Sequence, residues 1–160
     1  AHRLVLEMDP GSAFGTGSHP TTRLCLEALE AMPPRDQRVA DLGCGSGVLG
    51  LASLALGASE VLAADTDSLA VRDTTDNAAL NGLKAEQLRV SHGSIDTLAT
   101  LLNGEAADLL LCNILAPVIE ALAPQFASVL KPDGRGLLSG LLVLEVHKME
   151  NLRGILHSIN

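Results

Sequence analysis

Short apolar runs alternate with helix-like segments along most of this chain. Five runs suit buried strands, at residues 38–43, 60–65, 88–93, 107–113 and 135–142. Helical spacing of apolar residues predicts helices at 20–31, 48–56, 68–81, 95–102, 115–130 and 145–157. A strand that alternates with a helix five times predicts right-handed β-α units and a mainly parallel sheet. We therefore predict an α/β three-layer sandwich with a doubly wound sheet, preceded by a short strand at residues 4–8.

The composition agrees with this fold. The chain has 160 residues, enough for one domain, and is 47% hydrophobic but only 1% aromatic. Its core must therefore consist of Leu, Val, Ile and Ala, as in sheets whose strands are buried on both faces. Because no apolar stretch reaches 18 residues and nothing at the start resembles a signal peptide, we expect no membrane span or leader.

Charge and cysteine usage narrow the choice of partners. The formal net charge of -8 argues against a nucleic-acid surface and suits small molecules or basic partners, although it could equally serve solubility alone. Cys25, Cys44 and Cys112 lie far apart without a C-x-x-C pair, which suggests reduced thiols in a cytoplasmic protein. The five histidines are also scattered, so no metal site is expected.

Two loops close together are unusually rich in glycine. Residues 8–22 (MDPGSAFGTGSHPTT) hold three glycines, two prolines and five hydroxyl side chains, and residues 41–47 (DLGCGSG) hold three more glycines. A connector needs only a few turn residues. Two such loops suggest backbone that must approach something other than protein.

The second loop lies where α/β proteins bind ligands, beyond the carboxyl ends of their strands. Gly43 permits a tight turn, Gly45 lets a ligand approach the backbone, and Gly47 lets the next helix pack closely. The spacing differs from the dinucleotide pattern G-x-G-x-x-G, which binds a pyrophosphate. Asp65, twenty residues beyond Gly45, is placed to accept ribose hydroxyls, since Asp67 is better placed to cap the following helix.

These features favour a nucleoside-type cofactor, and S-adenosylmethionine fits well. The residues 93–94 and Asn113 follow the third and fourth strands at the same edge. Ser94 could face an adenine, although a helix cap is the simpler role.

Several longer stretches resemble the catalytic domain of the PrmA family, the methyltransferases of large-subunit ribosomal protein eleven. They are DPGSAFGTGSHPTTRLCLEAL, DLGCGSGVLGLASLALGA, VLAADTDSLAVRDTTDNAALNG and LCNILAPVIEALAPQFASVLKPDGRGLLSGLL. The resemblance runs from about residue 4 to 142, and FGTGSHPTT together with NILA is its most specific part. It implies the Rossmann-like fold of class I methyltransferases and methyl transfer from S-adenosylmethionine to lysine and N-terminal amines of that ribosomal protein.

The resemblance also implies roles for the first loop. The family's matching loop folds over the cofactor, so Thr22 is expected to contact S-adenosylmethionine. Phe14 and His19 are expected to line its methionine end and the reaction centre. For His19 beside Pro20, a helix-start role is an equal alternative.

At the strand ends the resemblance assigns Gly43 to the cofactor, with Gly45 in the same loop, and Asp65 to its ribose. Asn113 is expected beside the transferring methyl group, as both a cofactor contact and the catalytic residue. Its simpler alternative is a residue that only ties down the loop after the fourth strand.

The chain departs from the family pattern at both ends. The family carries an N-terminal domain that recognises the ribosomal protein, whereas residues 1–160 match the catalytic domain alone. The two strands that finish the family's sheet are also expected to be missing. The resemblance of residues 1–160 therefore bears on cofactor binding and not on recognition of the protein substrate.

Other functions are compatible with parts of the pattern. Class I methyltransferases of nucleic acid or glutamine amides commonly carry Asn-Pro-Pro-Tyr or Asn-Pro-Pro-Phe, whose ring stacks on the planar substrate; here residues 113–116 read NILA. A nicotinamide-dependent oxidoreductase is disfavoured by the glycine spacing, and a binding module without activity by the presence of Thr22 and Asn113.

Overall fold

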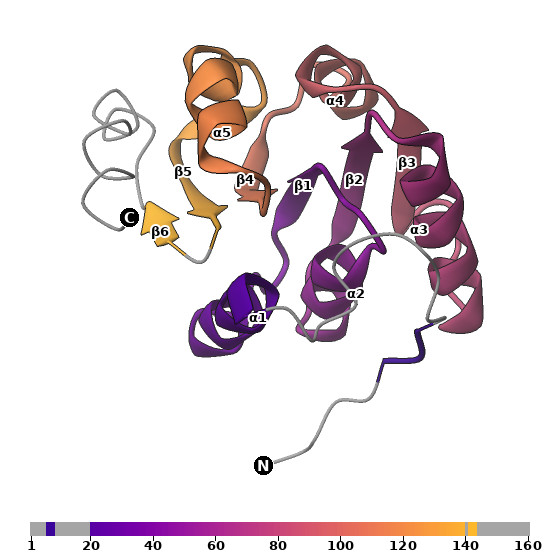
Figure 1. The fold of residues 1–160 in the computed structure, drawn as a ribbon. Coiled ribbons are helices and arrows are strands. Elements are labelled where there is room, and N and C mark those ends of the chain that lie inside the picture. The colour runs from indigo at the N-terminus through magenta and orange to yellow at the C-terminus, as the bar shows by residue number, and fades with distance from the viewer. Residues whose placement is uncertain (1–5, 9–19, 140, 144–160) are drawn as a thin grey trace.

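A computed structural model describes residues 6–8, 20–139 and 141–143, and its centre is a twisted sheet (Figure 1). The strands are β1 Arg38–Leu42, β2 Glu60–Asp65, β3 Leu88–His92, β4 Ala107–Cys112, β5 Leu130–Leu138 and β6 Leu141–Val143. Their order across the sheet is β3-β2-β1-β4-β5-β6. Every pair is parallel except β5 with β6. The predicted mainly parallel, doubly wound sheet is therefore confirmed.

Helices cover both faces of this sheet. They are α1 Pro20–Ala31, α2 Val48–Ala55, α3 Ser68–Leu80, α4 Ile95–Leu102, α5 Ala116–Leu122 and the 3₁₀ helix η1 Ala123–Ser128. Figure 1 shows α1, α2 and α3 on one face, with α4 and α5 on the other. No helix within the described ranges is both long and apolar enough to cross a bilayer.

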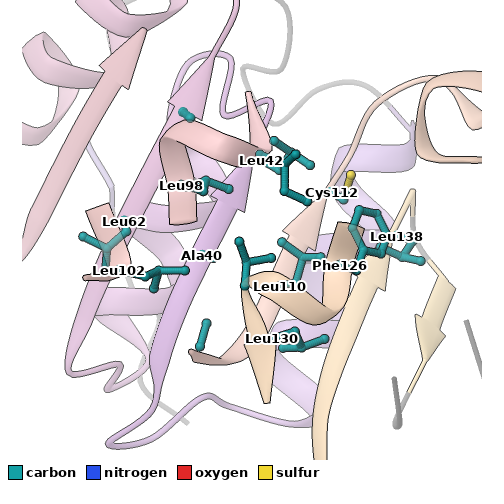
Figure 2. Close-up of a cluster of buried hydrophobic side chains, with 14 of the residues drawn as sticks. Ala40, Leu42, Leu62, Leu98, Leu102, Leu110, Cys112, Phe126, Leu130 and Leu138 are labelled. Atoms are coloured by element: carbon teal, nitrogen blue, oxygen red, sulfur yellow. The ribbon is translucent and has the colours of Figure 1, made fainter. Parts of the chain in front are cut away.

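Alternate strand residues supply two cores. On the face covered by α4 and η1, Ala40, Leu110 and Phe126 are fully buried in one cluster (Figure 2). On the opposite face Val39 and Leu111 pack in a second cluster with residues of α1 and α2. Both clusters consist almost entirely of aliphatic side chains, as the composition predicts. The period of two along each strand creates this division, because successive side chains point to opposite faces.

Local signals set several of the boundaries. The side chain of Asp67 accepts a hydrogen bond of 2.9 Å from the backbone N–H of Leu69, which confirms it as the N-cap of α3. The same helix ends at Leu80, with Asn81 as its C-cap residue and Gly82 after that at φ +68°. A left-handed residue of this kind is the common way for a helix to end.

The structure corrects three predicted elements, beginning with the helix at 115–130. The α-helix stops at Leu122, and Pro124 lies in η1. Proline lacks the N–H that an α-helix needs and its ring clashes with the carbonyl four residues earlier. The chain then enters β5 at Leu130, so the predicted turn KPDG lies within the strand. There the pairing shifts from Ala107–Leu130 to Leu109–Arg135, and a bulge takes up the additional residues.

The structure also differs from the predicted fifth strand at 135–142 and from the predicted strand at 4–8. The chain reverses after Leu138, and β6 pairs antiparallel with β5, which the sequence pattern did not predict. Residues 6–8 form no strand; instead the side chain of Asn81 bonds the N–H and the carbonyl of Glu7, at 3.1 and 2.9 Å. The predicted helix at 145–157 lies outside the described residues.

Candidate functional site

One edge of the sheet gathers the candidate residues. The carboxyl ends of parallel strands lie at the same edge, and strand order reverses where β1 lies between β2 and β4. Ligands bind at such switch points. Gly43 follows β1, Asp65 ends β2 and Asn113 follows β4, so the fold brings these predicted site residues to the switch point.

The glycine loop takes a backbone shape that other residues rarely adopt. Gly43, Gly45 and Gly47 have φ values of +72°, +56° and +86°. A Cβ on Gly43 would lie 2.4 Å from the side chain of Ile114, and a Cβ on Gly47 would lie 2.9 Å from that of Thr74. Gly47 thus allows close helix packing, as predicted, and Gly43 allows contact with the loop that contains Asn113.

Asp65 is anchored by the backbone around it. Its Oδ2 accepts a hydrogen bond from the N–H of Gly45 at 3.0 Å, and its Oδ1 accepts one from the N–H of Asp67 at 2.9 Å. An ionised carboxylate has about four acceptor positions. Each oxygen of this half-buried side chain can therefore accept a further hydrogen bond, while the glycine loop and the start of α3 hold it in place.

A second carboxyl group lies beneath the loop, and the sequence analysis did not identify it as a site residue. Asp41 in β1 is 2% exposed, and its Oδ2 has no hydrogen-bond partner. Burial and, to a smaller extent, the charge of Asp65 raise the pKa of Asp41 to about 7. A hydrogen bond from the N–H of Gly50 acts in the opposite direction and lowers the pKa. Gly50 lies in the first turn of α2, whose N-cap residue provides no side-chain bond. The buried carboxyl thus caps that helix.

Two buried polar residues of α3 support the glycine loop and were also missed. Thr74 Oγ1 donates to the carbonyl of Gly45 at 3.0 Å, and Asn77 Nδ2 donates to the carbonyl of Ser46 at 2.8 Å. Both are almost completely buried. Their spacing of three residues on one helix face was the available signal, but it could not reveal which backbone they would meet.

Asn113 is held by a residue from the other end of the chain. Its Nδ2 donates to Oγ1 of Thr22 at 3.1 Å, and Thr22, in the first turn of α1, is completely buried. This bond uses one of the two amide N–H groups and fixes the plane of the amide, whose carbonyl oxygen can accept hydrogen bonds from another partner. The structure thus joins these two predicted residues. The contact of Thr22 with the cofactor stays a prediction.

The sequence also singled out Ser94, three cysteines, Phe14 and His19. Ser94 occupies the N-cap position of α4 but makes no capping hydrogen bond with its side chain. Cys25, Cys44 and Cys112 are buried and form no disulfide with one another, and burial raises the pKa of the Cys44 and Cys112 thiols. The expected roles of Phe14 and His19 fall outside the described residues.

The edge suits a nucleoside-type cofactor on two observations. The carboxylate of Asp65 is oriented by two backbone N–H groups and retains acceptor positions for ribose hydroxyls. The glycine loop beside it has left-handed backbone at Gly45 without a side chain, which allows close approach.

Comparison with known proteins points to one family. The sequence profile of ribosomal protein L11 methyltransferase (PrmA) matches residues 1–154. The chain is 68% identical over 152 residues to the ribosomal protein L11 methyltransferase of Parasynechococcus marenigrum, covering 95% of this chain and 53% of that protein. It is 65% identical over 150 residues to the Prochlorococcus marinus protein of the same name, covering 94% and 50%. The chain thus spans about half the length of these curated relatives.

Solved structures agree. A ribosomal protein L11 methylase from Lactobacillus delbrueckii is 36% identical with a TM-score of 0.67, over 81% of this chain and 63% of that one. A 16S rRNA N2 G1207 methyltransferase from T. thermophilus, in complex with AdoMet and guanosine, is 28% identical with a TM-score of 0.63, over 84% and 40%. These similarities confirm the class I methyltransferase fold, and S-adenosylmethionine is the family's cofactor, as predicted. On the extent of the profile match and the identity to its relatives, the chain belongs to the PrmA family of ribosomal protein L11 methyltransferases.

Proposed function

We propose that this chain is the catalytic domain of an enzyme that methylates lysine and N-terminal amines of ribosomal protein L11. The observation that carries the proposal is the position of Asn113. Its amide is fixed by Thr22 at the sheet edge that also holds the glycine loop and Asp65. The names of the relatives support L11 as the substrate.

The chain's own residues would hold the cofactor at three points. Asp65 accepts hydrogen bonds from the ribose hydroxyls, and the backbone at Gly43 and Gly45 lies against the ligand. Thr22, together with Phe14 and His19, is assigned to it by the family resemblance. When bound, S-adenosylmethionine supplies an activated methyl group.

Asn113 would orient the accepting amine. Its bond to Thr22 fixes the orientation of the amide, and the side-chain carbonyl oxygen accepts a hydrogen bond from the amine. The carbonyl of Ile114 provides a second acceptor next to it. Two acceptors fix the direction of the nitrogen lone pair, and alignment of this kind is a large part of catalysis for a displacement reaction.

The amine must be neutral before it reacts. With an ordinary lysine pKa of about 10.4, deprotonation at pH 7 costs roughly 4 to 5 kcal/mol. The NILA segment offers no carboxylate as a base, and Asp41 is buried under α2. We therefore expect the proton to leave to water, so that turnover rises with pH toward the amine pKa.

The setting of this activity is part of the proposal. Residues 1–160 act as the catalytic domain, with recognition of L11 by a separate N-terminal domain like that of the family, in the cytoplasm and without direct nucleic-acid contact. The net charge of -8 supports a basic protein partner over RNA.

The test is Asn113→Ala in the intact protein, with purified L11 as acceptor and radiolabelled S-adenosylmethionine. The cofactor Kd should change by no more than a few-fold, whereas the transfer rate should fall about a hundredfold. Gln125→Ala removes an exposed amide from η1 and should leave both values unchanged. Mass spectrometry of the product should locate the methyl groups on lysine and N-terminal amines. Undiminished turnover in Asn113→Ala, or a bell-shaped pH profile centred near neutrality, would contradict this mechanism.

A further inference from the structure

Ser139, the turn residue directly after β5, forms hydrogen bonds with the residues on both sides of Asn113. Its backbone N–H donates to the carbonyl of Cys112 at 3.0 Å, and its Oγ donates to the carbonyl of Ile114 at 2.6 Å. The two acceptors are the immediate neighbours of Asn113 in the sequence. One residue at the turn after the adjacent strand thus holds the peptide groups that set the direction of the Asn113 side chain.

The backbone conformation of Ser139 is a second observation that indicates a role for its side chain. It has φ +46°, in the left-handed region, which costs a residue with a Cβ roughly 1–2 kcal/mol. Glycine would adopt the same conformation without that cost. Strain of this kind at a ligand-binding edge indicates that the side chain has a task there. Among the described residues, the hydroxyl donates to the carbonyl of Ile114.

The same short segment is also held from its other sides. The side chain of Ile114 lies against Gly43, so close that a Cβ there would be 2.4 Å from it. The side chain of Asn113 is tied to Thr22. With Ser139 added, the segment is fixed to β5, to the glycine loop and to α1.

We propose that Ser139 is a positioning residue for methyl transfer, which aims the Asn113 amide and the Ile114 carbonyl at the accepting amine. By donating to Ile114, its hydroxyl turns that carbonyl in one direction and leaves the second lone pair for the amine. Ser139 itself need not touch substrate or cofactor. The inference rests on the proposed role of Asn113.

Two substitutions separate positioning from stability. Ser139→Ala and Ser139→Gly both remove the hydroxyl, but only glycine relieves the left-handed strain, so Ser139→Gly should melt about 3 °C above Ser139→Ala. Despite this difference, kcat for L11 methylation by the intact protein should fall about tenfold or more in both variants. The cofactor Kd should stay within about threefold of that of the unaltered protein.

Ser128→Ala is the matched control. The hydroxyl of Ser128 also donates to a backbone carbonyl at 2.6 Å, that of Gln125, but it lies on η1 and is exposed. Its loss should leave kcat unchanged. If the Ser139→Gly variant keeps full kcat, or if kcat in the two Ser139 variants follows their melting temperatures, the proposal is wrong.

A double variant links Ser139 to Asn113. If the hydroxyl acts through Asn113 and Ile114, Ser139→Ala should slow turnover much less in the Asn113→Ala background than alone. Equal slowing in both backgrounds would overturn the proposal. The outcome is separable from that of the proposed function: full turnover in Asn113→Ala refutes the role of Asn113, whereas slow Asn113→Ala with normal Ser139 variants refutes only the role of Ser139.

Discussion

At the scale of single residues, Asp65 shows how a local backbone prepares a side chain for binding. Both carboxylate oxygens already accept a backbone N–H, from Gly45 and from Asp67. A ligand that adds hydrogen bonds to them need not order the side chain first. Preorganisation of this kind increases affinity because the entropy of ordering has already been lost on folding.

Replacement of Asp65 by alanine should therefore weaken S-adenosylmethionine binding at least about tenfold. Hydrogen bonds to a charged group contribute about 1.5–3 kcal/mol each, and 1.4 kcal/mol corresponds to a factor of ten in Kd. Isothermal titration calorimetry measures the change directly, and circular dichroism checks the fold. Asp76→Ala removes an equal charge from the exposed face of α3 and should leave the affinity as it was. Unchanged affinity in a folded Asp65→Ala protein would refute the ribose assignment.

At the scale of elements, α3 organises the ligand edge from behind. Thr74, Asn77 and the C-cap residue Asn81 follow one another at spacings of three and four residues along one side of this helix. The first two bond the glycine loop, and Asn81 bonds the backbone of Glu7. One helix therefore positions both the loop after β1 and the segment at residues 6–8.

The contact between β1 and α2 makes a pH-dependent contribution to stability. Asp41 has a pKa of about 7 in the folded protein, raised by burial from 3.8. Between about pH 4 and 7 the folded state keeps a proton that the unfolded chain has released, so the free energy of unfolding falls as the pH rises. The fall attributable to Asp41 is on the order of 4 kcal/mol.

The substitution Asp41→Asn should remove that fall. Asparagine keeps an acceptor oxygen for the Gly50 amide but does not ionise, so the variant should gain stability over the unaltered protein from pH 5 to pH 8. Urea unfolding of both proteins without cofactor, at several pH values, gives the difference between their free energies of unfolding. The contributions of all other titrating groups cancel in this difference. Asp76→Asn should show no such trend. A stability difference that is the same at pH 5 and pH 8 would show that Asp41 does not titrate in this range.

At the scale of the whole molecule, the ligand edge joins parts that are distant in the chain. β1, β2 and β4 all end there, and the Thr22–Asn113 hydrogen bond spans 91 residues. A ligand bound at this edge should stabilise the sheet as a unit, because only the folded state assembles the site.

We expect S-adenosylmethionine to raise the melting temperature and NAD to leave it unchanged. At a concentration of about 100 times Kd, binding adds about 2.7 kcal/mol to the free energy of unfolding. For a domain of this size that corresponds to roughly 5–10 °C. Differential scanning fluorimetry with each cofactor makes the comparison. An equal shift with NAD would favour a nicotinamide-binding protein over a methyltransferase.

The periodicity of apolar residues, together with the glycines and aspartates that mark turns and helix ends, was enough to predict the fold class. Strands 60–65 and helices 20–31 and 95–102 have their predicted bounds, and the cap at Asp67 is confirmed. These features depend on neighbours in the sequence, and local chemistry decides them. Because strands of a parallel sheet end at one edge, the grouping of Gly43, Asp65 and Asn113 was also predictable.

Tertiary structure decided what depends on partners far along the chain. Asp41 is buried by residues of other elements. The bonds from Thr74 and Asn77 to the glycine loop, and the two bonds from Ser139 around Asn113, join separate elements. No periodicity encodes such pairs, since a serine or asparagine has the same local preferences whichever carbonyl it meets. The turn after Leu138 was missed for a related reason. Ser139 has left-handed backbone, and its hydrogen bonds to the carbonyls of Cys112 and Ile114 hold it in that conformation. Only the folded sheet brings these carbonyls close to Ser139.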